Sequence, residues 1–198
     1  MSIVGLDPRG TRTPPSEQAI PIAPRPVSLD GATLGIVGNG LNRGNEFLRA
    51  VAREVGHLAA ISDEIPVAKH GLAVPPDPAD WQRLVAGATV AITGFGGCGS
   101  CSSRSMRDAI ELEAERIPAV AIVHEALQGA VKAIARLSHM NGYRFVIVPY
   151  PYQTIATWTD AEIAELSRSV APAVVHLLTQ ASAGPDESSP VSRWIGVA

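Results

Sequence analysis

Short apolar runs alternate along the chain with longer stretches in which apolar residues recur every three or four positions. The apolar runs are typical of buried strands and lie at Thr33–Val37, Thr89–Thr93, Ala119–Val123 and Phe145–Val148, with less regular candidates at Ile61 and Ile65–Ala68. Helical spacing is found at about 45–58, 78–84, 103–116, 125–140 and 160–178. Strands that are apolar throughout and alternate with helices predict a parallel sheet covered on both faces. We therefore expect a single three-layer α/β domain, flavodoxin-like or Rossmann-like, with a four- or five-stranded parallel sheet.

The two ends of the chain lack this alternation. Residues 1–30 are rich in proline and show neither period, which predicts an extended N-terminal arm on the domain or on a neighbouring subunit of a homo-oligomer. Residues 181–198 are rich in Ser, Pro and Gly and are expected to form a C-terminal tail, for which Trp194 and Ile195 offer an anchor. The α/β catalytic domain should therefore span residues 31–180.

Composition excludes several classes of protein. The chain has 198 residues, 46 % of them hydrophobic and 18 % charged, which suits one globular domain. Its formal net charge is −3 and Lys and Arg do not cluster, so nucleic-acid binding is not indicated. No apolar run is long enough to span a membrane and the N-terminus has no secretory signal, so we expect a cytoplasmic protein. A structural disulfide is not expected in that compartment.

Polar and reactive residues gather after the predicted strands. Because the carboxyl ends of parallel strands lie at one edge of a sheet, these residues should share one crevice. They are Asn39, Asn42 and Asn45 after the first strand, the segment Gly94–Ser103 after the strand at Thr89–Thr93, His124 after the next strand, and Tyr150 after the last.

The segment Cys98-Gly99-Ser100-Cys101 holds the only two cysteines of the chain. Glycine-rich backbone suits a tight strand-to-helix turn, and Ser102 or Ser103 would cap the helix that follows. Sulfurs near a helix N-terminus are expected to have a lowered thiol pKa. Cys98 would then be a nucleophile, and Cys101 would attack a sulfur adduct on Cys98. The alternative is two small buried residues in a glycine-rich turn; a zinc site would need four ligands, and no second Cys pair or paired His spacing is present.

Two further features bear on the chemistry. The run Gly35-Ile-Val-Gly38-Asn-Gly40 has the spacing GxxGxG rather than the dinucleotide fingerprint GxGxxG, so a tight turn with Asn side chains is favoured over a flavin or phosphate site, which stays open. His124 is the best acid/base candidate among the five histidines because it lies at a strand end. Lys69 could reach the site. Asp108 is expected to be solvated or capping, with an inward orientation in the first turns of the helix as the alternative.

The segment from Gly97 to Val120 resembles the UGSC-type (seleno)protein family in its all-cysteine form. Cys98 matches the selenocysteine position of the family motif and Cys101 the motif cysteine. The early Asn39 and the run Pro149-Tyr150-Pro151 also look like the family pattern. Some relatives carry His where this chain has Tyr150, so an acid/base role is not expected there. Exchange of selenium and sulfur at one position implies redox or strongly nucleophilic chemistry.

These observations lead us to expect a thiol-dependent enzyme, a reductase of a small organic electrophile. A non-redox lyase, isomerase or hydrolase with a cysteine nucleophile is one alternative, and a flavin- or nucleotide-binding module is the other. No cofactor and no metal is expected, an external dithiol would reset the disulfide, and the substrate would be a small molecule of anionic character. The predicted catalytic residues are Cys98, Cys101 and His124, and the predicted substrate-binding residues are Asn39, Asn42, Asn45, Gly97, Gly99, Ser100, Ser102 and Tyr150.

Overall fold

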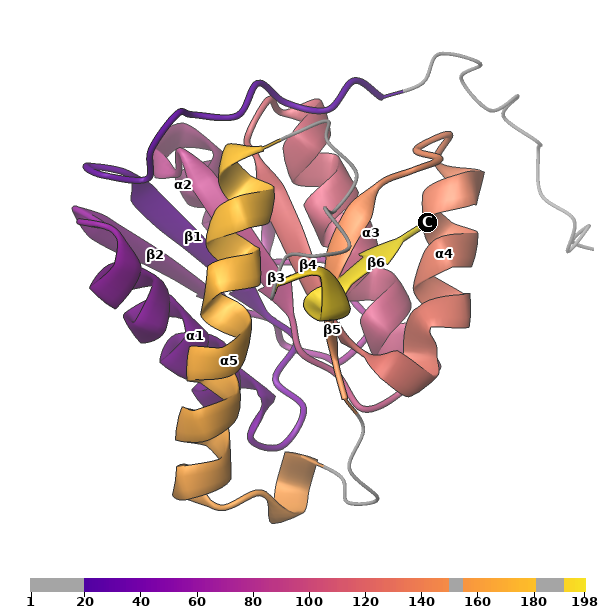
Figure 1. Ribbon diagram of the computed structural model, residues 1–198. Helices are drawn as coiled ribbons and strands as arrows, with labels where there is room; N and C mark the ends of the chain where they lie inside the picture. Colours follow the sequence, from indigo (N-terminus) through magenta and orange to yellow (C-terminus); the bar gives the residue numbers. More distant parts are fainter. Residues whose placement is uncertain (1–19, 150–154, 181–190) are drawn as a thin grey trace, which may run out of the picture.

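A computed structural model of the chain describes residues 20–149, 155–180 and 191–198. It contains a sheet of order β2-β1-β3-β4-β5-β6, with the first five strands parallel and β6 antiparallel to β5 (Figure 1). The strands are β1 (Thr33–Gly38), β2 (Asp63–Ala68), β3 (Val90–Gly94), β4 (Ala119–His124), β5 (Arg144–Val148) and β6 (Ile195–Val197). The helices are α1 (Gly44–Leu58), α2 (Pro78–Gly87), α3 (Gly99–Ala114), α4 (Gln128–Leu137) and α5 (Asp160–Thr179). The predicted three-layer α/β domain is confirmed, and the order of the first five strands is the flavodoxin-like one.

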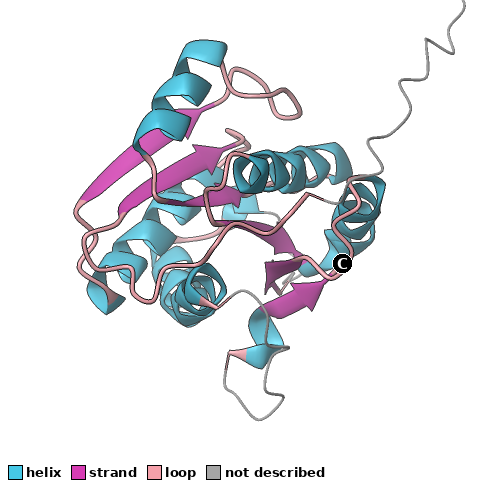
Figure 2. Ribbon diagram, turned by 90° about the horizontal axis from the view of Figure 1, so that it is seen from above, coloured by secondary structure: helices cyan, strands magenta, loops and turns pink. Residues whose placement is uncertain are grey.

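Helices cover both faces of the sheet (Figure 2). Successive strand residues point to opposite faces, so each strand supplies two cores. In β1, Leu34 and Ile36 enter the core formed with α1 and α5, whereas Val37 enters the core formed with α2, α3 and α4. This two-sided burial explains why the strands read as unbroken apolar runs rather than as alternating ones.

Several boundaries differ from the prediction. Helix α3 begins at Gly99, so Cys98 is its N-cap rather than Ser102 or Ser103. Glycine and serine have low helix propensity, which hid this first turn in the sequence. The region predicted as one helix at 125–140 begins with a 3-10 turn (Glu125–Leu127) and continues as α4, and Ile61 lies outside β2.

The C-terminal residues also depart from the prediction. The end of the predicted tail forms β6, in which Ile195 pairs with Val146 and Val197 with Arg144. Trp194 and Ile195 are buried, which confirms their role as an anchor. A three-residue strand is too short to give a periodic signal, and this is why the sequence did not predict a sixth strand.

The described part of the N-terminal arm lies on the domain of the same chain. Ala23 and Leu29 are buried, and the Ala23 N–H donates to Glu113 Oε2 at 2.7 Å. Arg25 forms an ion pair with the same carboxylate, with Nη2 at 2.7 Å from Oε1. These contacts fasten the arm beside the start of β4.

Strand β2 lies at the opposite edge of the sheet from β6. It carries Pro66 in its middle, and the Pro66 carbonyl accepts a hydrogen bond of 3.0 Å from the Arg83 guanidinium of α2. Strand β2, which is exposed at most positions, therefore differs from the buried central strands β1, β3 and β4.

Candidate active site

The loops that follow β1 and β3 meet at the carboxyl edge of the sheet. Gly38 and Gly94 are register partners, and the Asn39 N–H donates to the Gly94 carbonyl at 2.9 Å. A Cβ on Gly96 would lie 2.6 Å from Asn39 Nδ2 and 2.6 Å from Cys101 Cβ, so only glycine permits this approach. The strand order reverses between β1 and β3, and this is the position at which open α/β sheets bind ligands.

The two cysteines lie at this position and are joined by a disulfide, with their Cα atoms 5.4 Å apart. Cys98 is partly exposed, whereas Cys101 is 0 % exposed. Cys98 has extended backbone geometry, and its Sγ accepts the Cys101 N–H at 3.3 Å. The outer sulfur therefore occupies the place that a side-chain oxygen takes at most helix N-termini.

The outer sulfur, Cys98 Sγ, lies at the start of α3 beside backbone N–H groups. The first turn of α3 contains no acidic residue, so the unpaired amides and the helix dipole are not opposed there. Ser100 Oγ lies 3.5 Å from Cys98 Sγ. Arg104 and Arg107 of the same helix are both engaged by Glu111, and Arg104 also by Asp108. The polar groups that contact Cys98 Sγ are the Cys101 N–H and Ser100 Oγ.

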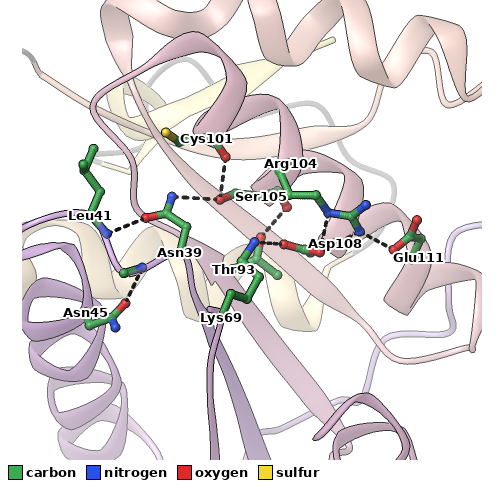
Figure 3. Close-up of polar contacts among 11 residues, drawn as sticks. Asn39, Leu41, Asn45, Lys69, Thr93, Cys101, Arg104, Ser105, Asp108 and Glu111 are labelled. Atoms are coloured by element: carbon green, nitrogen blue, oxygen red, sulfur yellow. Dashed lines mark hydrogen bonds and ion pairs between the residues drawn. The ribbon is translucent and has the colours of Figure 1, made fainter. Parts of the chain in front are cut away.

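Three neutral side chains connect the start of α3 to the strand ends (Figure 3). Asn39 Nδ2 donates to Ser105 Oγ at 3.3 Å, and Ser105 Oγ donates to the Cys101 carbonyl at 3.1 Å. Thr93 Oγ1 donates to the Ser105 carbonyl at 2.7 Å. Asn39, Thr93 and Ser105 are all buried, so this network orders the helix from inside.

A buried ion pair lies farther along the same helix face. Lys69 Nζ is 2.5 Å from Asp108 Oδ2, and both side chains are 0 % exposed. Arg104 binds the other Asp108 oxygen, with Nε at 2.8 Å (Figure 3). Burial lowers the pKa of Lys69 and raises the pKa of Asp108, and the attraction between the two opposes both shifts. Asp108 is therefore neither solvated nor capping, as was favoured, but turned inward, which was the alternative; its position seven residues after Cys101, on the face packed against the sheet, was the available signal.

His124 lies within a group of aromatic side chains. It is the last residue of β4 and is 0 % exposed. Its ring centroid is 4.3 Å from that of Phe95 and 5.9 Å from that of Trp158. Burial lowers the His124 pKa to about 4, so the imidazole is neutral at pH 7. In this state it can accept a proton but is a weak base, and the acid/base role predicted for it stays a hypothesis.

Exposure divides the other predicted site residues into two groups. Asn42, Gly97 and Ser100 are exposed and Gly99 is partly exposed, so the neighbours of Cys98 in its own loop are accessible with it. Asn39 and Ser102 are buried, and Ser102 Oγ donates to the Gly96 carbonyl at 3.4 Å. The prediction for Tyr150 falls outside the described residues.

The loop after β1 already uses several of its amides internally. The Gly40 N–H donates to Asn45 Oδ1 at 3.2 Å, and the Leu41 N–H donates to Asn39 Oδ1 at 3.2 Å. The Gly44 N–H donates to the Leu41 carbonyl at 2.8 Å. Asn39 and Asn45 thus hold the loop in shape, and fewer amides remain to bind a phosphate.

The cysteine loop lies within a region that matches a known protein family. The model of the UGSC family matches residues 5–180, which include both cysteines and every strand from β1 to β5. The chain belongs to the UGSC family. The resemblance seen around the Cys98–Cys101 motif is thereby confirmed for this UGSC protein. Neither the curated proteins nor the solved structures give a significant match to the chain.

Among residues 20–149, 155–180 and 191–198, no three His, Cys, Asp or Glu side chains come together in a way that would hold a metal ion. In the same ranges no helix has both the length and the apolar composition to cross a membrane.

Proposed function

We propose that this protein is a thiol-dependent reductase of a small organic electrophile, with Cys98 as the nucleophile and Cys101 as the resolving thiol. The observation that supports this most is the asymmetry of the disulfide, in which Cys98 is partly exposed at a helix N-terminus and Cys101 is fully buried. An incoming molecule meets Cys98 first, and only an adduct already on Cys98 lies within reach of Cys101.

The reaction begins with the reduced protein. The Cys98 thiolate attacks the electrophilic atom, so that a sulfur–substrate bond forms and the leaving group departs with its electron pair. The Cys101 thiolate then attacks Cys98 Sγ, the disulfide forms, and the sulfur–substrate bond breaks. The organic fragment leaves with that electron pair and takes up a proton. The substrate gains two electrons, the dithiol loses two, and an external dithiol of a reducing compartment such as the cytoplasm regenerates the thiols.

A model electrophile tests this mechanism directly. Reduced protein is treated with 2-bromoacetophenone, and the products are followed by mass spectrometry with dithiothreitol as the external dithiol. We expect acetophenone and a Cys98–Cys101 disulfide from the wild type, a stable thioether on Cys98 in Cys101→Ser, and no adduct at that position in Cys98→Ser. A Cys98 adduct that persists in the wild type without disulfide formation would instead favour non-redox covalent catalysis.

A flavin- or nucleotide-binding module is the second candidate. The strand order β2-β1-β3-β4-β5 favours it, because flavodoxin-like proteins bind their cofactor between β1 and β3. The internal hydrogen bonds of Gly40, Leu41 and Gly44 weigh against it, since these amides would have to be released to bind a phosphate. Visible absorbance of a bound flavin in the purified protein would favour this candidate over the reductase.

A further inference from the structure

Polar side chains hold α3 against the ends of three different strands. Cys101, Ser105 and Asp108 are spaced four and three residues apart, so they share the helix face that packs on the sheet. Asn39 after β1 and Thr93 in β3 contact Ser105. Lys69, which directly follows β2, contacts Asp108 (Figure 3). The dithiol helix is therefore fixed to the sheet by polar contacts at Ser105 and Asp108, one and two turns beyond Cys101.

Among these contacts, the Lys69–Asp108 ion pair places the strictest requirement on the position of α3. Burying two charges is costly, and apolar residues of similar volume usually give equal or greater stability. What an ion pair adds is a unique geometry, since a sliding or rotation of α3 would leave both charges unpaired in the interior. Lys69 is itself held in place, because its N–H donates to the Gly38 carbonyl at 3.4 Å. The pair thus links the position of α3 to the loop that carries Asn39.

We propose that Lys69 is a positioning residue for the dithiol. By binding Asp108 it keeps α3 in register with the strand ends, so that the Cys101 N–H and Ser100 point at Cys98 Sγ. This inference rests on the proposed function, because it assigns Lys69 a role in making the Cys98 thiolate reactive. The Lys69 side chain is buried, so it does not contact the substrate and acts only through the helix.

The chemical consequence concerns the acidity of Cys98. The Cys101 N–H lies 3.3 Å from Cys98 Sγ, and a hydrogen bond to a thiolate favours the charged form. Cys98 is joined to β3 by residues 95–97 and Cys101 lies in α3, so a shift of α3 against β3 changes the angle at which the Cys101 N–H and the helix dipole meet the sulfur. The pKa of the thiol then returns toward the ordinary value of about 8.5. A rise of about one pKa unit lowers the thiolate fraction by up to about tenfold, with the full factor reached below both pKa values.

The test measures the rate of iodoacetamide alkylation of Cys98 against pH in the reduced protein. Lys69→Met removes the charge while keeping most of the length of the side chain. Arg25→Met is the matched control, because it breaks a buried ion pair of the same helix at Glu113, in the last turn. We expect Lys69→Met to raise the Cys98 pKa and slow alkylation at pH 7 by up to about tenfold, whereas Arg25→Met leaves the profile unchanged although it destabilises the protein.

A second variant keeps the test informative if Lys69→Met does not fold. The double variant Lys69→Met with Asp108→Leu replaces the pair by apolar side chains, and Arg104 keeps its contact with Glu111. It should fold and show the same rise of the Cys98 pKa. A wild-type profile in the folded double variant, or an equal shift in Arg25→Met, would overturn the role of Lys69. An ordinary Cys98 pKa in the wild type would overturn the proposed function instead, so the two failures are distinguishable.

Discussion

Helix α3 carries two buried carboxylates, and the two differ in their partners. Asp108 lies just past the middle of the helix and is bound by two cations, Lys69 and Arg104. Glu113 lies in the last turn, is 1 % exposed, and pairs with Arg25. The other partners of Glu113 among the described residues are neutral groups. Two carboxylates five residues apart on one helix are thus neutralised in different ways.

Neutral donors complete the site of Glu113. Its oxygens accept the N–H groups of Ala23 at 2.7 Å and Ala119 at 2.9 Å, and the Tyr143 hydroxyl lies 3.3 Å from Oε1. The same hydroxyl donates to the Ala119 carbonyl at 2.6 Å, and burial raises the Tyr143 pKa well above its ordinary value. Glu113 therefore joins the N-terminal arm, the start of β4 and the segment before β5.

The difference follows from the two edges of the sheet. The Glu113 contacts lie at the amino end of β4, where nothing in the described chain suggests chemistry, and they connect segments distant in sequence. The Asp108 contacts lie at the carboxyl edge, where ligands bind in such sheets, and they orient the helix that bears the cysteines. We infer that loss of the first site lowers stability alone, and that loss of the second also changes thiol reactivity.

The largest expected effect is at Glu113. Glu113→Ala removes the acceptor of two backbone N–H groups and leaves the Arg25 charge without its partner, so we expect a loss of about 3–5 kcal/mol in the free energy of unfolding. Urea denaturation measures this loss. The nearby exposed Glu115→Ala should change it little. Slower Cys98 alkylation in a folded Glu113 variant would contradict the inference that the Glu113 site affects stability alone.

The second largest effect is expected when the pH is lowered, through protonation of His124 at the carboxyl edge of the sheet. Its pKa is about 4 in the folded protein and about 6.5 when exposed, so the unfolded chain binds the proton more readily between these values. Stability from the neutral imidazole is complete above about pH 6.5 and falls by about 3 kcal/mol as the pH drops to about 4.

Denaturation curves at several pH values check this contribution. His124→Phe should flatten the pH dependence of the free energy of unfolding between about pH 4 and 6.5, whereas the exposed His57→Gln should keep the wild-type slope. An unchanged slope in His124→Phe would show that another group is responsible.

A smaller effect is expected when the disulfide is reduced. The two cysteines are three positions apart, so the bond restricts the unfolded chain little and contributes about 2 kcal/mol at most. Thermal or urea unfolding with and without dithiothreitol measures this, and the double variant Cys98→Ser with Cys101→Ser should match the reduced wild type. A loss twice as large would indicate a structural disulfide rather than a catalytic one.

The smallest effect concerns the neutral network at the start of α3. Ser105→Ala removes the partner of Asn39 and the hydrogen bond to the Cys101 carbonyl, which should cost about 1 kcal/mol. The partly exposed Ser103→Ala is the control. Because Thr93 and Lys69 still hold the helix, the Cys98 pKa should change less in Ser105→Ala than in Lys69→Met. The reverse order would move the positioning role from Lys69 to Ser105.

The sequence predicted those parts of the fold that depend on local apolar pattern. Strands buried on both faces give unbroken runs, and the rule for parallel sheets correctly put Asn39 and the cysteine loop at one edge. The start of α3 was missed because capping by Cys98 depends on a sulfur that accepts an amide hydrogen, which propensity does not report. Strand β6 was missed because its three residues are ordered by pairing with β5 rather than by a period of their own.

In the candidate site, too, the sequence predicted what local pattern contains and missed what depends on distant contacts. Cys98 and Cys101 were found because they are the only cysteines and share a turn. The pairing of Lys69 with Asp108 depends on contacts between residues 39 positions apart, which no local pattern contains. The side-chain roles of Asn39 and Asn45 in holding their own loop were hidden for a similar reason, since a polar residue after a strand looks the same whether it faces a ligand or the backbone.

The construction of the two sheet edges affects how copies of this chain can meet. An open edge strand can recruit a strand of another molecule and so begin aggregation, and proline or very short strands prevent this. Pro66 removes a backbone donor from the outer strand β2, and the Arg83 guanidinium donates a hydrogen bond to the Pro66 carbonyl. At the other edge β6 offers only three residues. Growth into a continuous intermolecular sheet is therefore disfavoured at both sides, and any dimer of this protein should form through helices or the N-terminal arm.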